Sequence, residues 1–406
     1  MTARSRDRLP RRGRLGHRLT GGVAAAIALV LVSVEPAHAD SIRARQWAID
    51  TLHLDQAWGT TKGDGVTVAV LDTGVDDSHP DLTGQVLPTK DLVGFGAGRG
   101  DRAWARHGTA MAGIIAGRGH GPGREDGVLG VAPQAKIQPV RVILEGTDPS
   151  RAQARKTRTS ALADGIRWAA DNGADVINLS LGDDSESAHP EQGEDAAVQY
   201  ALAKGAVVVA SAGNSGEKGD HISYPAAYPG VIAVTAVDRF GTHASFSTSR
   251  WYATVSAPGV DVVIADPDRK YYEGWGTSAA AAFVSGVVAL VRSAHPDLTP
   301  AQIKQLLADT ARDAPEGGRD DARGYGTVDP VAALKAARKV TPGELSPGES
   351  TSSSAPGHRK RYFGSGPAPA QDGATPGGML VPLAGGTGVL LLVCAALLWR
   401  GGRRRT

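Results

Sequence analysis

The stretch from residue 276 to residue 290 constrains the fold of this chain more than any other. It reads Gly-Thr-Ser-Ala-Ala-Ala-Ala-Phe-Val-Ser-Gly-Val-Val-Ala-Leu, and no charged residue occurs between Gly274 and Val291. A helix that is apolar on all sides is a buried helix, so we expect this one to run through the middle of a domain. Ser278 lies at its start, where unpaired backbone N–H groups can stabilise an anion. The stretch therefore suggests either a reactive serine beside an oxyanion site or a serine that only caps the helix.

Charge is distributed unevenly along the 406 residues. The whole chain has a formal net charge of +2, yet acidic residues outnumber basic ones between Asp40 and Lys339. The basic excess therefore lies at the two ends, whereas a nucleic-acid-binding domain would normally be basic itself. We expect no nucleic-acid partner. The length provides ample material for one large core or two ordinary ones.

The first 39 residues have the order of a secretory signal. An arginine-rich stretch precedes an apolar run from Gly22 to Val34, and a small Ala-His-Ala sequence ends at Ala39. This order predicts a signal peptide over residues 1–39 and export of the rest. The single cysteine, Cys394, lies near the other end of the chain, so the exported domain must be stable without a disulfide.

The C-terminal part predicts a membrane anchor. Residues 340–378 are rich in Pro, Gly, Ser and Ala and predict a linker. Residues 379–399 are uncharged and supply about the twenty residues that a membrane span requires. The arginine-rich tail 400–406 then places the C-terminus in the cytoplasm and the folded domain outside. The alternative is a sorting signal for covalent wall attachment, since residues 383–388 resemble such a signal with an additional glycine.

Strands and helices alternate between these ends. We expect a short N-terminal strip, residues 40–58, packed on a domain that spans residues 59–339. Strand runs that are apolar on both faces and are separated by helices indicate a parallel sheet covered on both sides. The fold class is therefore α/β, a three-layer sandwich with a mainly parallel central sheet, plus one C-terminal transmembrane helix. The segment from Glu145 to Thr159 is basic and predicts an exposed loop that could be clipped. The predicted strands are Thr67–Leu71, Ile137–Ile143, Val176–Gly182, Val207–Ser211 and Val231–Ala236.

Three polar residues stand at the ends of buried elements. Asp72 ends a predicted strand, and His107 and Ser278 each begin a small, apolar helical segment. Serine is a weak nucleophile unless a base accepts its proton, and an imidazole base needs a carboxylate to fix its tautomer. Catalytic groups in open α/β sheets lie at such ends. Separately, each residue could merely cap a turn or a helix, but together they predict a catalytic triad.

Two other enzyme classes fit the motifs less well. An aspartic protease also uses Asp-Thr-Gly, which occurs at residues 72–74, but it needs two carboxylates that share a proton. No second Asp-Thr-Gly or Asp-Ser-Gly occurs in the chain. An esterase would more often present Gly-x-Ser-x-Gly, whereas Ser278 lies in Gly-Thr-Ser-Ala-Ala.

The chain resembles the subtilisin-like serine proteases over approximately residues 47–337. The resemblance rests on the order Asp, His, Ser and on four motifs. These are Val-Leu-Asp-Thr-Gly-Val at 70–75, His-Gly-Thr at 107–109, Ser-Ala-Gly-Asn at 211–214 and Gly-Thr-Ser at 276–278. It implies a subtilisin-like fold in which Ser278 is the nucleophile, His107 the general base and acid, and Asp72 its orienting partner.

The same resemblance implies how a substrate is held. Asn214 would donate a side-chain hydrogen bond to the oxyanion, beside the amide of Ser278. The segment Ser180, Leu181 and Gly182 would pair with an extended peptide, which favours a protein or peptide substrate. The acids that follow it, residues 183 and 184, suggest either a preference for basic substrate residues or solvated side chains.

Other features of the resemblance concern structure. His79 and Asp81 match a common loop of the family and are assigned a structural role. No cofactor is required; the resemblance allows a structural calcium ion, for which the sequence offers no ligand cluster that can be named. Many relatives have a bulky residue directly after the nucleophile and a proline four residues after it, whereas this chain has Ala279 and Ala282. Neither change removes a catalytic atom, but both affect the expected pocket shape and helix bend.

The layout narrows the resemblance to one group. A tryptophan-containing N-terminal strip without a long pro-domain, a linker, a terminal span and a basic tail resemble the membrane-anchored mycosins linked to type VII secretion. This resemblance implies an exported endopeptidase in the cell membrane, with its catalytic domain extracellular and with secretion-system components as partners. The main alternative is a scaffold in a secretion complex with little proteolysis. A scaffold would need the surface and the span, whereas an enzyme needs Ser278 and His107.

Overall fold

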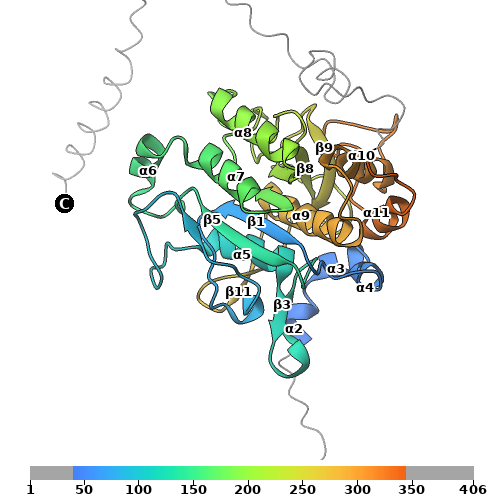
Figure 1. The fold of residues 1–406 in the computed structure, drawn as a ribbon, viewed down its shortest axis with the longest axis horizontal. Helices are drawn as coiled ribbons and strands as arrows, with labels where there is room; N and C mark the ends of the chain where they lie inside the picture. The colour runs from blue at the N-terminus through green and yellow to red at the C-terminus, as the bar shows by residue number, and fades with distance from the viewer. Residues whose placement is uncertain (1–39, 344–406) are drawn as a thin grey trace, which may run out of the picture. The chain divides into compact units, whose positions relative to one another are not determined.

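A computed structural model describes residues 40–343, and every structural statement below concerns that part of the chain (Figure 1). The predicted signal peptide, most of the predicted linker, the predicted membrane helix and the predicted basic tail lie outside these residues. A seven-stranded sheet forms the middle of the described domain, in the order β2-β5-β1-β6-β7-β8-β9. Its pairings are all parallel, which confirms the prediction of an α/β fold with a mainly parallel central sheet. The strands are β1 (Thr67–Asp72), β2 (Lys90–Asp91), β5 (Lys136–Arg141), β6 (Val176–Leu179), β7 (Val207–Ser211), β8 (Ile232–Val237) and β9 (Ala253–Pro258).

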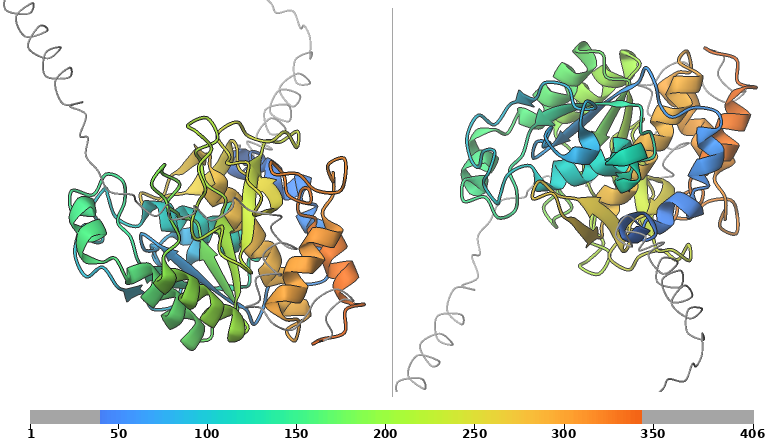
Figure 2. Two further views of the ribbon diagram at one scale, coloured as in Figure 1. Left: turned by 90° about the horizontal axis from the view of Figure 1, so that it is seen from above. Right: turned by 90° about the horizontal axis from the view of Figure 1, so that it is seen from below.

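The two faces of the sheet bury two separate cores. Because successive side chains of a strand point to opposite faces, Val68 and Val70 of β1 join one core, and Ala69 and Leu71 join the other. Helices α5, α9, α10 and α11 cover the first face, and α7 and α8 cover the second (Figures 1 and 2). Their bounds are α5 (Arg106–Ala116), α7 (Ala161–Asp171), α8 (Gln192–Ala203), α9 (Thr277–Ala294), α10 (Pro300–Thr310) and α11 (Pro330–Ala337).

Helix α9 is the buried helix that the sequence predicts. Nearly all of its residues are buried, and it packs against β6, β7, β8 and α5. Gly276 precedes it with φ 138°, a conformation that side chains rarely allow, and so permits the sharp turn into the helix. Within residues 40–343, α9 alone is long and apolar enough to cross a membrane. Since 83% of it is buried inside the domain, its composition reflects a position in the core.

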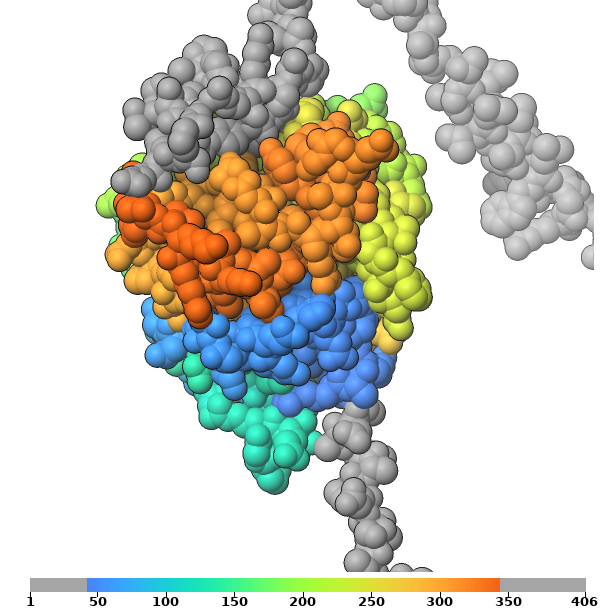
Figure 3. Space-filling model, turned by 90° about the vertical axis from the view of Figure 1, so that its right-hand side faces the viewer, coloured from blue at the N-terminus to red at the C-terminus, as the bar shows by residue number. Residues whose placement is uncertain are grey.

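The N-terminal strip consists of the short helices α2 (Asp40–Arg43), α3 (Trp47–Thr51) and α4 (Leu54–Trp58). It lies as a blue band directly against the orange C-terminal helices in Figure 3. The indole of Trp47 donates to the carbonyl of Asp261 at 3.0 Å, and Arg45 pairs with Glu273 at 2.6 Å. Asp261 directly precedes strand β10 (Val262–Ala265). Glu273 lies in strand β11 (Tyr271–Gly274), which pairs with β10 in antiparallel orientation. The N-terminal strip is therefore bonded to the segment that precedes Ser278 in the chain.

Two sequence-based expectations about local structure are wrong. The segment from Glu145 to Thr159 is not simply an exposed loop, because it contains helix α6 (Arg151–Thr157). Ala154 packs in a small core with Val93 and Leu144, since the segment folds back onto the sheet edge. The predicted strand from Val176 to Gly182 is also shorter, because β6 ends at Leu179 and the next three residues have no partner strand in the described domain.

Candidate active site

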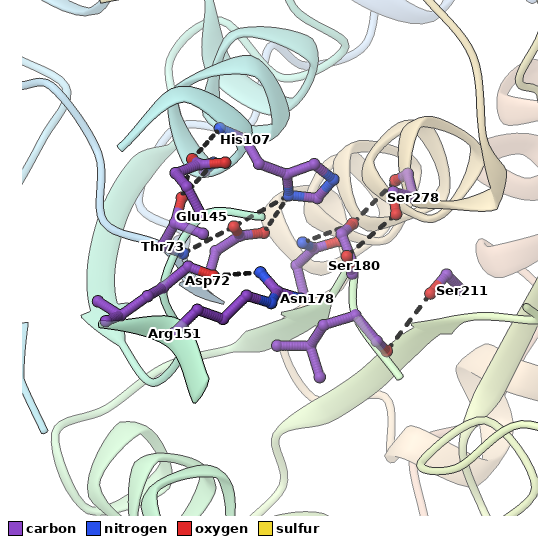
Figure 4. A network of polar contacts seen from close by, with 12 residues as sticks. Asp72, Thr73, His107, Glu145, Arg151, Asn178, Ser180, Ser211 and Ser278 are labelled. Atoms are coloured by element: carbon purple, nitrogen blue, oxygen red, sulfur yellow. Dashed lines mark hydrogen bonds and ion pairs between the residues drawn. The ribbon is translucent and has the colours of Figure 1, made fainter. Parts of the chain in front are cut away.

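Three predicted site residues converge where β1 ends and where α5 and α9 begin. Asp72 is the last residue of β1 and is fully buried, whereas His107 and Ser278 are each the second residue of their helices. Helices α5 and α9 pack against each other, and Figure 4 shows the imidazole between Asp72 and Ser278. The Nδ1 atom of His107 lies 2.9 Å from both carboxylate oxygens of Asp72. An Nδ1–H bond to this carboxylate leaves the lone pair on Nε2, on the far side of the ring.

The environment of His107 favours its charged form. Burial opposes protonation, but the charge and hydrogen bond of Asp72, with a further contribution from Glu145, raise the pKa of His107 to about 8. A buried carboxylate beside an imidazole stabilises the imidazolium that forms when the ring accepts a proton. The ring is therefore suited to act as a base at mildly alkaline pH.

The hydroxyl of Ser278 forms its hydrogen bond with Ser180 and not with the imidazole of His107. Its Oγ donates to the carbonyl of Ser180 at 3.0 Å, and the Ser180 hydroxyl donates to the carbonyl of Ser278 at 2.8 Å. No hydrogen bond joins Ser278 to His107 in residues 40–343. Catalytic hydrogen bonds are often formed only in the substrate complex, and a serine hydroxyl can change its acceptor by rotation about its Cα–Cβ bond.

Asn214 is oriented by the turn before α9. Its Oδ1 accepts hydrogen bonds from the backbone N–H of Thr277 at 2.9 Å and from the Thr277 hydroxyl at 3.0 Å. With Oδ1 engaged, the Nδ2 protons are left for a ligand. The N–H of Ser278 lies in the first turn of α9 and has no intrahelical acceptor. Two donors are thus available at the start of α9.

The segment predicted to bind substrate follows β6. The backbone of Ser180, Leu181 and Gly182 pairs with no other strand of the described domain, so an extended peptide could add there. Pairing resumes at Asp183, whose N–H donates to the carbonyl of Tyr224 at 2.9 Å. Asp184 is not simply a solvated acid, because it accepts the backbone N–H of Asn214 at 2.6 Å.

Several supporting residues were not predicted from the sequence. Asn178, fully buried in β6, accepts from the hydroxyl of Ser285 in α9 at 3.0 Å and donates to Ser180 Oγ at 3.0 Å. It therefore fixes α9 against the sheet. A polar residue inside an apolar strand run is the signal that could have revealed it. Glu145 and Thr73, which contact the start of α5, gave no such signal.

The structural role assigned to His79 and Asp81 agrees with their contacts. Asp81 is fully buried and accepts hydrogen bonds from the His120 ring at 2.6 Å and from the Tyr271 hydroxyl at 2.8 Å. Its own N–H donates to the ring of His79. Residues 40–343 contain no group of three or more His, Cys, Asp or Glu side chains arranged to hold a metal ion.

The parallel sheet, with a carboxylate, an imidazole and a hydroxyl gathered where its elements end, has the arrangement of a serine-type endopeptidase. The profile of the subtilase family matches residues 63–326. The chain belongs to the subtilase family.

Comparison with individual proteins also finds subtilisin-like proteases. Fervidolysin from Fervidobacterium pennivorans is 38% identical over 316 residues, which cover 71% of this chain and 43% of fervidolysin. Subtilisin DY from Bacillus licheniformis is 40% identical over 252 residues, which cover 62% of this chain and 85% of that protein. The crystal structure of MycP1 with its N-terminal propeptide removed matches with a TM-score of 0.60 and 35% identity. That match covers 71% of this chain and 96% of MycP1, so the suspected similarity to subtilisin-like proteases and mycosins is confirmed.

Proposed function

We propose that this chain is an exported, membrane-anchored serine endopeptidase in which Asp72, His107 and Ser278 form the catalytic triad. The observation that carries the proposal is the contact of His107 Nδ1 with both oxygens of the buried Asp72, at 2.9 Å each. This contact aims the basic Nε2 away from Asp72, and the imidazole lies on the side of Ser278 (Figure 4).

Peptide bonds are cleaved through an acyl-enzyme. The Ser278 hydroxyl turns from Ser180 toward Nε2 of His107, transfers its proton to the ring and attacks the substrate carbonyl carbon. The resulting oxyanion accepts hydrogen bonds from Asn214 Nδ2 and from the Ser278 N–H. The imidazolium, stabilised by Asp72, then protonates the leaving amine. Water attacks the ester by the same route, with His107 again as the base.

The substrate is a protein or peptide in extended form. The backbone from Ser180 to Gly182, which pairs with no strand of the described domain, lies directly beside Ser278, because Ser180 exchanges two hydrogen bonds with it. A substrate strand added there brings its scissile carbonyl to the start of α9.

The place of action is the outer face of the cell membrane. The predicted signal peptide, anchor and basic tail support this location, and so does the similarity to MycP1, which is described as an essential component of the type VII (ESX-1) secretion system. We propose secretion-system components as partners on the same grounds. A scaffold role with little proteolysis is the second candidate, and the intact set of catalytic groups favours the enzyme.

Labelling of the full-length chain in membranes with a serine-reactive fluorophosphonate tests the proposal. We expect the wild type to be labelled in the membrane fraction and Ser278→Ala to take no label. Ser293→Ala changes a serine of the same helix that bonds to Asp64 instead, and should be labelled as the wild type is. A folded wild type without label would favour the scaffold, and label found only in the soluble fraction would contradict the anchor.

Asn214→Leu is expected to lower kcat with little change in KM, because a side chain of similar size then offers no donor to the oxyanion. The loss should be on the order of 10²–10³, the magnitude known for removal of this donor in subtilisin. Thr277→Val removes one of the two donors that hold Asn214 Oδ1 and should cost roughly tenfold. Steady-state kinetics on a fluorogenic peptide measure both. An Asn214→Leu variant with wild-type kcat would exclude Asn214 from the oxyanion site.

A further inference from the structure

A second carboxylate contacts the start of the helix that carries His107. Glu145 Oε1 accepts the backbone N–H of His107 at 2.7 Å and the hydroxyl of Thr73 at 2.7 Å. The Thr73 hydroxyl in turn accepts the N–H of Gly108 at 3.2 Å. Figure 4 shows Glu145 beside both residues. One carboxylate therefore joins the residue after Asp72 to the residue that supplies the imidazole.

Glu145 supplies the cap that α5 lacks locally. The residue before the helix is Ala105, which has no polar side chain, adopts φ 54° and makes no side-chain capping bond. The first N–H groups of a helix need acceptors from outside it, and a negative charge is favourable there. Because His107 is the second residue of α5, the group that caps this turn also fixes the backbone from which the imidazole extends.

Charged groups face His107 from three elements. Asp72 lies at the end of β1, Glu145 follows β5, and Arg151 begins α6 and donates to the carbonyl of Leu144. Burial lowers the pKa of His107, Asp72 and then Glu145 raise it, and Arg151 lowers it. Glu145 and Arg151 both belong to the segment between β5 and α7, so this segment adds two opposed charges to the site.

We propose that Glu145 is a positioning residue, which holds the first turn of α5 so that the imidazole of His107 meets Asp72, and whose charge favours the imidazolium. This inference rests on the proposed function, because it assigns Glu145 a role toward the catalytic base. It also couples the segment 145–157 to catalysis, since displacement of that segment removes the carboxylate from α5.

Two substitutions at Glu145 separate geometry from charge. Glu145→Gln keeps an oxygen acceptor for His107 and Thr73 but removes the charge. We expect its plateau kcat to stay within about twofold of the wild type, and the acid limb of kcat/KM to move down by about half a pH unit. Glu145→Ala removes the acceptor as well, and its plateau kcat should fall roughly tenfold, since misplacement of a catalytic group is costly. Arg151→Met removes the opposing charge and should move the acid limb to higher pH.

A titration independent of activity completes the test. The imidazole of His107 is followed by NMR in the full-length Ser278→Ala chain with labelled histidine, assigned by comparison with a chain that also carries His107→Ala. We expect the His107 pKa to fall with Glu145→Gln and to rise with Arg151→Met. If neither substitution moves this pKa and Glu145→Ala keeps the wild-type plateau, the inference is overturned. If Glu145→Ala does not fold, the NMR titrations of Glu145→Gln and Arg151→Met decide whether the inference stands.

The failure of this inference and that of the proposed function are distinguishable. A wild type that hydrolyses no peptide and behaves as Ser278→Ala does would contradict the proposed function. The NMR titration would still report whether Glu145 acts on His107, because it requires no turnover.

Discussion

His107→Ala is expected to lower kcat/KM for a peptide substrate by on the order of 10⁶-fold, the magnitude known for loss of the base in subtilisin. Without the imidazole, the Ser278 hydroxyl loses the proposed base that accepts its proton, and the leaving amine loses the acid that would protonate it. The effect should lie in kcat, because the backbone from Ser180 to Gly182, which we propose pairs with the substrate, is unchanged. Steady-state kinetics on a fluorogenic peptide, with thermal unfolding as a folding check, measure the loss.

The chain offers a matched control for this substitution. His120 is also paired through Nδ1 with a fully buried carboxylate, that of Asp81, and its side chain is 37% exposed, as is that of His107. His120→Ala therefore removes the same kind of imidazole–carboxylate contact from β3 (Arg118–His120). It should lower stability and leave kcat within a few-fold of the wild type. Equal losses of activity in both variants would mean that His107 acts only through folding, which would contradict its catalytic role.

Asp72→Asn is expected to lower kcat by about 10⁴-fold, because an asparagine fixes the wrong tautomer of the imidazole. Its side-chain N–H can donate to Nδ1 of His107, which moves the ring proton to Nε2. A protonated Nε2 cannot accept the proton of Ser278. The buried site keeps its shape, since asparagine and aspartate have nearly the same size, so the folded fraction should change little compared with kcat.

The pH dependence of the same variant provides a second readout. The base must be neutral to act, so wild-type kcat/KM should rise with pH, with an inflection near the His107 pKa of about 8. Asp72 is the main group that raises this pKa against the effect of burial. Its neutralisation should therefore move the inflection in the residual activity to lower pH. A wild-type profile without an inflection between about pH 7 and pH 9, or an unchanged inflection in Asp72→Asn, would contradict this assignment.

The sequence predicts the sheet well where strands are mostly apolar. Strands β1, β6, β7 and β8 bury Val, Ile, Leu and Ala on both faces, which is the pattern of a covered parallel sheet. Strand β9 was not predicted, because it contains Thr254 and Ser256. Thr254 Oγ1 accepts the N–H of Ala233, and the Ser256 hydroxyl pairs with that of Thr327. Such polar residues are compatible with a core only through partners that the local sequence does not reveal.

The residues of the candidate site also fall into those that the sequence predicts and those that it does not. The three residues of the proposed triad stand at the ends of apolar elements, so their proposed roles follow from residue type and order. Glu145 could not, because its bonds to His107 and Thr73 span 38 and 72 residues and depend on how the segment after β5 folds back. The acceptor of the Ser278 hydroxyl was also beyond sequence reasoning, because the bond to Ser180 spans 98 residues and depends on the rotamer of the serine.

The contacts of the N-terminal strip have a consequence for the timing of assembly. Trp47 and Arg45 bind Asp261 and Glu273, which are synthesised more than two hundred residues later, in the stretch that precedes Ser278. Helix α9 also fills the centre of the larger core, so that core is complete only when the nucleophile is in place. A chain that is still being made therefore has neither a finished core nor a finished site. Proteolytic competence would arise together with the folded domain, after the whole of it has emerged.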